Sequence, residues 1–419
     1  MFVSGSSASV ESVLFRSVLH LGGSFVILRL GAMAETEDLP EEIIVNIFTW
    51  LPVKSLIRFT SVSKRLHSII LSDPKFAQSQ LKAARQQKTL NRRLLVSTEV
   101  PQLESLQLDD TPSFGEPSSV RKLSFPFQPQ PGGYVKLLGS CNGLVFVAVD
   151  NKLFFIWNPS IGFSKQLPDP GFPLDDNVLP YYGVAYLSAT DDYKVLVASY
   201  CIPEEELEVE MFSLRIHIWQ RIESPCRSDF RLFRGQGTLL NDAFHWVNYP
   251  DNNEEEEHEI VSFDLKEEVF RRMPLPNFDH DGKTSTSLGV CGGCLCVPRY
   301  PDGAFDFIDF WVMRQYGFSG SWIMLFSLKF SDPPELPLYS REFLVVESCT
   351  VAANWTGEGF ELIKIDHKED EKLGRYIVKG LCMCMVEYEE SLLWISGYHP
   401  VEEKEQVKIL ETHQKASGS

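Results

Sequence analysis

Apolar residues recur at two different periods along this chain, and the change of period divides it. Between residues 38 and 81 they lie three and four positions apart, as in the set Ile43, Ile44, Ile47, Phe48 and Leu51, which is helical spacing. From Tyr134 onward, apolar and polar residues alternate in short runs bounded by Gly, Pro and Asn, which is typical of strands. The pattern predicts an α+β chain with a small helical module followed by a mainly β domain.

Prolines and capping residues set the expected helix boundaries. Asp38 and Glu41 have the spacing of a capping box, with Pro40 in the first turn. Pro52 ends the first run, and Asp73-Pro74 ends a third helix and caps a fourth. Helices this short are marginal alone, and a module of about 40 residues can hardly enclose a core. We therefore expect some of its apolar residues to face another protein; the alternative is an apolar cap on a larger domain.

The helical module contains the stretches LPEEII (39–44), LPVKSL (51–56) and DPKF (73–76). These stretches resemble the F-box of plant F-box proteins, although Leu66 stands where Trp is usual and one extra residue lies between His67 and Asp73. The resemblance implies binding to a Skp-like adaptor and, through it, to the cullin and RING subunits of an SCF-type (Skp-cullin-F-box) ubiquitin ligase. Carried over by position, the adaptor-binding residues would be Leu39, Pro40, Ile44, Ile47, Leu51, Pro52, Val53, Leu56, Val62, Lys64 and Leu66.

The β part of the chain repeats itself. Similar runs begin at Gly143, Ala243 and Gly293, and their separations are multiples of about 50 residues, the repeat length of kelch-like propeller blades. A unit of three or four strands cannot bury both faces alone, so neighbouring units must stack. We expect an irregular β-propeller of five to seven blades, with a pair of packed sheets as the alternative.

The same region contains GSCNGL (139–144), IWNPS (156–160), DYKV (192–195) and IVSFD (260–264). These stretches resemble the F-box-associated interaction domain of plants. The two resemblances together imply a non-catalytic substrate-recognition subunit of the ligase, whose β domain recruits a protein target for ubiquitination. Two alternatives stay open: a propeller-based hydrolase with a helical lid, and an F-box scaffold that acts outside the ligase.

The expected domain boundaries follow from these patterns. We expect a disordered or alternative-start extension over residues 1–34 and the F-box over 35–81. Organelle targeting is a second interpretation of the extension, because it holds Arg16, Arg29 and a single acid, Glu11. A linker with a first strand would cover 82–133, the propeller 134–400 and a polar tail 401–419.

Charge and cysteine content narrow the partners and the compartment. The 419 residues include 39 basic and 57 acidic ones, giving a net charge of −18, which disfavours nucleic acid and anionic membrane surfaces. Nine cysteines are few for a disulfide scaffold of this length, so we expect a reducing compartment, cytoplasmic or nuclear. The sequence contains no run of eighteen uncharged apolar residues, so it predicts no membrane-spanning helix.

Candidate chemistry is sparse. Cys291, Cys294 and Cys296 form the most metal-like cluster, but a structural zinc site needs four ligands and no second pair follows at ligand spacing, so we interpret these thiols as core residues. No phosphate loop, dinucleotide fingerprint or zinc-protease motif occurs, and we assign no catalytic residue, metal or cofactor. Large aromatic residues anchor many binding faces, so the weak candidates for target contact are Tyr181, Tyr182, Trp246 and Trp311, with blade core as the alternative.

Overall fold

The computed structural model describes residues 17–21, 24–28, 40–97, 102–108, 114–124, 126, 133, 135–172, 177–201, 206–223, 235–248, 259–276, 282–284, 287–301, 307–329, 342–346, 349–356, 358–367, 372–379 and 384–395. The chain divides into two compact units, residues 1–48 and 49–419. The first unit holds the hairpin of β1 (Ser17–Leu21) and β2 (Ser24–Leu28), followed by helix α1 (Glu41–Thr49). The hairpin lies within the predicted extension 1–34 and was not expected from the sequence; the other residues of that extension, and the tail 401–419, lie outside the described residues.

Three helices open the second unit: α2 (Val53–Phe59), α3 (Lys64–Ser72) and α4 (Pro74–Gln86). Their boundaries follow from capping chemistry. The Ser63 hydroxyl accepts a hydrogen bond from the Leu66 backbone N–H at 3.1 Å, and the Asp73 carboxylate accepts one from Lys75 N–H at 2.9 Å. Pro74 occupies the first turn of α4, where its missing N–H leaves no bond unmade. The four helices that the Pro and Asp positions predict are confirmed.

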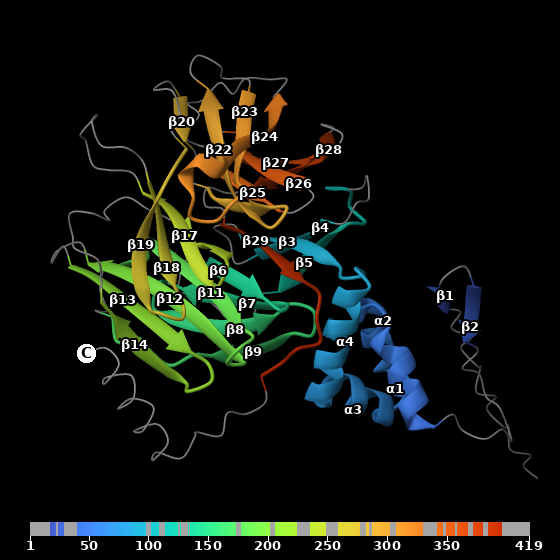
Figure 1. Ribbon diagram of the computed structural model, residues 1–419. Coiled ribbons are helices and arrows are strands. Elements are labelled where there is room, and N and C mark those ends of the chain that lie inside the picture. Colours follow the sequence, from blue (N-terminus) through green and yellow to red (C-terminus); the bar gives the residue numbers. More distant parts are fainter. Residues whose placement is uncertain are drawn as a thin grey trace, which may run out of the picture. The chain divides into compact units, whose positions relative to one another are not determined.

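Six sheets follow in the described part of the chain, and we number them as blades (Figure 1). Their strands pair antiparallel, apart from one parallel pair in the second blade. Blade 1 consists of β6 (Val135–Cys141), β7 (Leu144–Val149), β8 (Leu153–Asn158) and β9 (Phe163–Gln166). Blade 2 consists of β10 (Asn177–Val178), β11 (Tyr181–Leu187), β12 (Asp192–Cys201), β13 (Glu206–Ser213), β14 (Ile218–Ile222) and β15 (Gly235–Gln236). Blade 3 consists of β16 (Thr238–Leu240), β17 (Ala243–Asn248), β18 (Glu259–Asp264) and β19 (Val269–Pro274).

The remaining blades come from the C-terminal half and from both ends of the domain. Blade 4 consists of β20 (Gly282–Thr284), β21 (Gly289–Cys291), β22 (Cys294–Pro301), β23 (Phe307–Met313) and β24 (Trp322–Lys329), with the short 3-10 helix η1 (Ser319–Ser321) before β24. Blade 5 consists of β25 (Glu342–Val345), β26 (Cys349–Trp355), β27 (Gly359–Asp366) and β28 (Lys372–Lys379). Blade 6 consists of β29 (Cys384–Glu389), β3 (Arg92–Ser97), β4 (Gln102–Gln107) and β5 (Val120–Ser124).

Blade 6 closes the ring. The C-terminal strand β29 pairs antiparallel with β3, from Cys384 opposite Ser97 to Glu389 opposite Arg92. In Figure 1 the red strand β29 lies beside the cyan strand β3, although nearly 300 positions separate them in the chain. The interval 82–133, which we expected to be a linker with a first strand, therefore supplies three strands of a blade, and the propeller begins at Arg92 rather than at residue 134.

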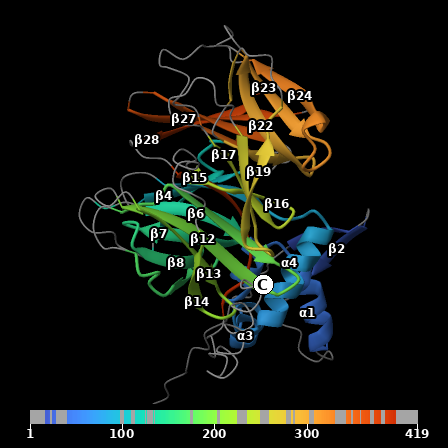
Figure 2. The same cartoon turned by 60° about the vertical axis from the view of Figure 1, so that its left-hand side comes forward.

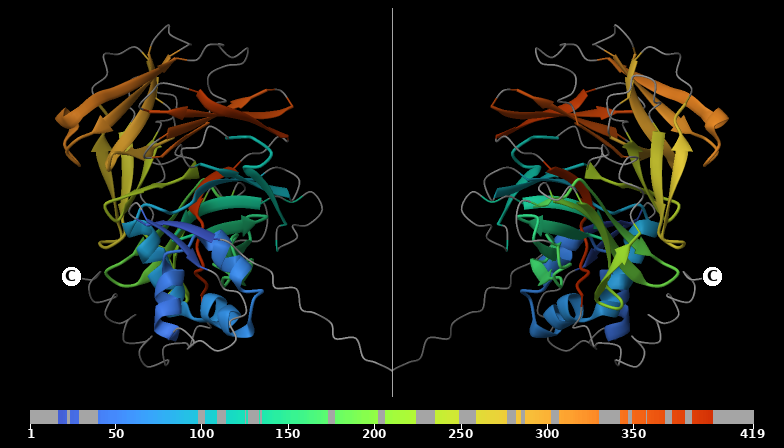
Figure 3. Two further views of the ribbon diagram at one scale, coloured as in Figure 1. Left: turned by 90° about the vertical axis from the view of Figure 1, so that its right-hand side faces the viewer. Right: turned by 90° about the vertical axis from the view of Figure 1, so that its left-hand side faces the viewer.

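Apolar clusters fill the spaces between successive blades. Leu138, Phe146 and Ile156 of blade 1 pack with Val184 and Phe212 of blade 2, and five further clusters join each blade to the next around the ring. The last cluster brings Leu95 and Val386 of blade 6 against Leu137 and Val147 of blade 1. Figure 2 and Figure 3 show, for example, blade 4 beside blade 5. The expected propeller of five to seven blades is confirmed, with six.

Candidate functional site

The helical residues divide by exposure into two groups. The exposed apolar side chains are Ile43 on α1, Trp50 after it and Val62 between α2 and α3, with exposed fractions of 44%, 48% and 56%. Each of these side chains is open to solvent and therefore accessible to a partner. Of the predicted adaptor residues, Pro40, Pro52 and Lys64 are also exposed, and Ile44, Ile47 and Leu66 are half-buried, while Leu39 lies outside the described residues.

Three predicted adaptor residues are instead buried in the chain itself: Leu51, Val53 and Leu56, of which Leu56 has no exposed surface. Side chains in such positions stabilise the module, and their contact with an adaptor stays a prediction. Sequence analysis did not single out Trp50, because the run of apolar residues around it gives no sign of which ones stay outside.

Helix α4 connects this module to the propeller. The buried Gln80 side chain donates a hydrogen bond to the Leu51 carbonyl at 3.1 Å, which ties α4 to the segment that precedes α2. Arg85, near the C-terminal end of α4, donates to Asn142 Oδ1 of blade 1 at 2.8 Å and pairs with Glu389 of blade 6 at 2.5 Å. Asn142 Nδ2 in turn donates to the Tyr193 hydroxyl at 2.8 Å. The turn of the GSCNGL stretch thus receives the helix.

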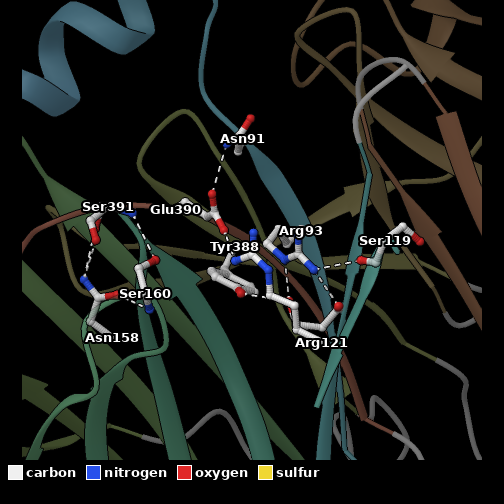
Figure 4. A network of polar contacts seen from close by, with 10 residues as sticks. Asn91, Arg93, Ser119, Arg121, Asn158, Ser160, Tyr388, Glu390 and Ser391 are labelled. Carbon is white, nitrogen blue, oxygen red and sulfur yellow. Dashed lines mark hydrogen bonds and ion pairs between the residues drawn. The ribbon is translucent and has the colours of Figure 1, made fainter. Parts of the chain in front are cut away.

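The chain segment after β29 is clamped by blade 1 (Figure 4). Asn158, the Asn of the IWNPS stretch, is fully buried and donates from Nδ2 to the carbonyls of Ser391 and Leu393 at 3.0 and 2.7 Å. The Ser391 N–H donates to the Ser160 hydroxyl at 3.3 Å. Carbonyl groups removed from water need hydrogen-bond donors, and the Asn158 side chain supplies them to residues 390–393. We call this segment, which follows β29, the closing strap.

Blade 6 is held by a buried guanidinium (Figure 4). Arg93 of β3 donates to the Ser105 hydroxyl and carbonyl, both at 2.6 Å, and to the Ser119 carbonyl at 2.9 Å. Burial lowers the pKa of Arg93, although the nearby Tyr388 opposes this shift. Arg121 pairs with the buried Glu390, which also accepts from Asn91 at 3.0 Å. These contacts join the first three strands of the domain to one another and to Glu390, the residue that follows the last strand.

The innermost strands surround a cavity of about 680 Å³, the channel of the propeller. Glu387 and Glu389 of β29 line it, and each is engaged by an arginine, at 3.6 Å from Arg92 and 2.5 Å from Arg85. Gln236 and Thr238 add polar groups from blades 2 and 3. Glycosidases act through two carboxyl groups that face the substrate, and the carboxylates described in this channel each face an arginine.

The four aromatic candidates for target contact pack in or against the clusters between blades, and Tyr182 also lines the channel. Tyr181 and Trp246 are buried, with ring centroids 5.3 Å apart in the cluster between blades 2 and 3. Tyr182 is buried between blades 1 and 2, and Trp311 is half-buried against the cluster between blades 3 and 4. These positions favour the core alternative over target contact.

Comparisons with known proteins agree with this architecture. Residues 37–78 match the F-box domain, and residues 109–394 match the F-box associated beta propeller domain. The chain is an F-box protein with an F-box associated propeller. It is 31% identical to F-box protein CPR1 of Arabidopsis thaliana, across 70% of this chain and 73% of that protein. It is 28% identical to F-box/kelch-repeat protein At3g23880 of the same plant, across 75% and 86%.

The motifs by which this F-box protein resembles its family are structural in the propeller. Asn142 receives α4, and Asn158 holds the closing strap, so neither side chain is free to choose a target. Other apolar side chains of the propeller are exposed. On the hairpin of β23 and β24, which we call the hairpin patch, the exposed residues are Tyr316, Phe318, Ile323, Met324 and Leu325. No motif marks it, because its residues read as an ordinary strand.

Two other expectations concern what this F-box protein binds. Within the described ranges, no group of three or more His, Cys, Asp or Glu side chains is placed to hold a metal ion. The described helices are all too short or too polar to cross a membrane.

Proposed function

We propose that this F-box protein is the substrate-recognition subunit of an SCF-type ubiquitin ligase. Its F-box would bind a Skp-like adaptor, which brings the cullin and RING subunits, and its propeller would bind a protein target. Holding target and charged conjugating enzyme on one scaffold raises their effective concentration, so the receptor itself needs no catalytic group. We place this activity in the cytoplasm or nucleus, where a chain with so few cysteines for its length would keep them reduced.

The observation that carries the proposal is the exposure of Ile43, Trp50 and Val62 in a module whose other large apolar residues are buried or half-buried. An adaptor that covers these side chains would remove apolar surface from water. The contacts of Arg85 with Asn142 and Glu389 join α4 to the propeller, so that the C-terminal part of the F-box and the proposed target-binding domain belong to one unit. The hairpin patch supports target binding by the propeller, because five exposed apolar side chains on one hairpin offer apolar area that a protein target could cover.

Binding of the full chain to a purified Skp-like adaptor tests the first step. Val62→Lys places a charge in the proposed contact. It should raise the Kd for the adaptor at least about tenfold, which is the effect of losing one energetically important interface residue. The matched control is Ile377→Lys, which changes an equally apolar residue with 65% exposure on β28 of the propeller. Unchanged binding by Val62→Lys, or equal loss in both variants, would contradict the assignment.

The second step is tested in cells with a proteasome inhibitor. The Val62→Lys variant should retain its target while losing the adaptor and cullin, so ubiquitin conjugates of that target should fall although its association does not. If conjugates persist without adaptor binding, the protein does not act through the ligase. The hydrolase alternative has no supporting observation, since both channel carboxylates are arginine-bound.

A further inference from the structure

The tip of the inner hairpin of blade 4 has a geometry that pairs two thiols. Cys291 ends β21 and Cys294 begins β22, and the two stand directly opposite each other in the antiparallel register. Gly292 and Gly293 between them have φ values of +57° and +70°, as a two-residue type I′ turn requires. Directly opposed residues in antiparallel strands have Cα atoms about 4.5 to 5.5 Å apart, and a disulfide accepts about 4.4 to 6.8 Å.

The two thiols also point to the same side of the sheet. Opposed residues project from one face, and Cys291 and Cys294 both contact the cluster between blades 4 and 5. Their access to solvent differs: Cys291 is buried, whereas Cys294 is half-buried beside two exposed glycines. A small oxidant can therefore reach Cys294 at the turn, whereas Cys291 is shielded from solvent.

A histidine faces the buried thiol. His367, which follows β27 of blade 5, has Nδ1 3.8 Å from Cys291 Sγ, and its Nε2 lies 2.8 Å from the Thr350 hydroxyl. When the Nε2–H donates to Thr350, Nδ1 is left as an acceptor toward the Cys291 thiol. Such an imidazole can take the proton of a thiol, and the thiolate is the form that attacks sulfur.

We propose that Cys291 and Cys294 are a reversible oxidation site for hydroperoxides. The Cys294 sulfur attacks one peroxide oxygen and the O–O bond breaks, which gives the sulfenic acid of Cys294. The thiol proton leaves with the other oxygen as water or alcohol. Cys291 then loses its proton to His367, its sulfur attacks the Cys294 sulfur, and the departing hydroxide takes that proton to leave as water. The peroxide is reduced and the two thiols are oxidised to one disulfide, which a dithiol reduces again. Formation of this disulfide, which we call closure, would prevent β21 and β22 from separating at their turn.

Treating the reduced full chain with hydrogen peroxide tests this site. Non-reducing peptide mapping after alkylation should find a Cys291–Cys294 disulfide that dithiothreitol reverses. Internal controls are Cys141 and Cys384, half-buried thiols that stand opposite Leu144 and Ser97 and have no thiol across the strand. Full alkylation of Cys291 after peroxide, or disulfides that join other cysteines in its place, would overturn the proposal.

Variants separate the roles of the three side chains. Cys294→Ser should abolish the disulfide, whereas Cys296→Ser, on the same face two positions away, should leave it intact. His367→Asn should slow closure at least about tenfold and raise the amount of Cys294 sulfenic acid that dimedone traps, because a positioned base speeds only the second step. If His367→Asn closes as fast as the natural protein, the histidine has no part in the step; if Cys296→Ser also prevents closure, the pair is wrong.

Discussion

A side-chain carbon placed on Gly143 would lie 2.6 Å from Cβ of Ser391, so the first turn of blade 1 and the closing strap touch with no room for a methyl group. The same carbon would lie 2.6 Å from the Glu389 carbonyl, which belongs to the backbone and cannot rotate away. Gly143 also has φ +79°, which disfavours any residue with a Cβ. Two independent requirements thus select glycine here.

Gly143→Ala should destabilise the propeller by about 3 kcal/mol, of which about 1 comes from the left-handed backbone and the rest from displacing the strap. Gly162→Ala is the matched control, because Gly162 has φ +71° and nothing within 4 Å of an added carbon. It should cost only about 1 kcal/mol. Chemical denaturation compares the two; equal losses would mean that contact with the strap contributes nothing.

Removing the amide of Asn158 should open the closing strap. Asn158→Ala leaves the carbonyls of Ser391 and Leu393 without their donor in a buried site, which should cost about 2 to 4 kcal/mol. Ser160→Ala removes a single longer bond from Ser391 N–H and should cost less than about 1 kcal/mol. Hydrogen exchange should rise in β29 and the residues after it for the first variant only; unchanged exchange in both would show that the strap is held elsewhere.

Sequence analysis predicted the helices and the repeating blades because both leave local signals. Element boundaries are determined by residues close by in the sequence: Pro52 and Asp73 for the helices, and the repeated starts at Gly143, Ala243 and Gly293 for the blades. Blade 6 leaves only one such signal, its first strand, since β29 pairs with β3 across almost the whole domain. The rest of the interval 82–133 is interpreted as a linker when the partner strands are not known. The pattern of apolar residues within a segment does not show which distant strand that segment pairs with.

The candidate site was also predictable only in part. Helical spacing predicts that the apolar residues of the F-box lie on helices, but it does not show that Leu56 is buried while Val62 is exposed. From the sequence, Trp246 is a candidate for target contact, because aromatic residues are common in both cores and interfaces. In the structure its indole packs on Tyr181 in the cluster between blades 2 and 3. Asn142 and Asn158 were recognised as motif residues, but their role depends on partners in α4 and after β29.

The stability of blade 2 should depend on one carboxyl. Burial raises the pKa of Glu210 to about 7, and the Arg221 charge across the strand opposes that shift. Because the folded pKa lies above the unfolded value, this group favours folding most below about pH 4.5, and its contribution is lost as the pH rises through about 7. Glu210→Gln should therefore be more stable than the natural protein by about 1 kcal/mol above pH 7, a value reduced for solvent around a half-buried group, and no more stable below about pH 4.5. Thermal denaturation across this range checks the sign, and a gain confined to acid pH would reverse it.

The ion pair between α4 and the propeller should contribute little by itself. Arg85 and Glu389 are 44% and 26% exposed, and pairs this open to solvent are worth about 0 to 1 kcal/mol. Arg85→Ala should lower stability by no more than about 1 kcal/mol and leave adaptor binding unchanged. Limited proteolysis between α4 and β3 should nevertheless quicken, since Asn142 also loses its donor. A large loss of global stability would show that the helix is a structural part of the propeller.

Leu56 and Val62 separate stability from adaptor contact within the F-box. Leu56 has no exposed surface, so Leu56→Ala should leave a cavity and cost about 2 to 5 kcal/mol, seen as faster hydrogen exchange in α2. Val62 is 56% exposed, so Val62→Ala should change stability by less than about 0.5 kcal/mol while it weakens adaptor binding. Adaptor binding by Leu56→Ala should recover when the adaptor is in excess, because binding draws the folded form from the equilibrium. Binding by Val62→Ala should keep its reduced affinity at every stability, since its loss lies in the contact. If Leu56→Ala instead kept natural exchange rates and lost binding irrecoverably, Leu56 would be an adaptor contact after all, and the module would have to open to receive its partner.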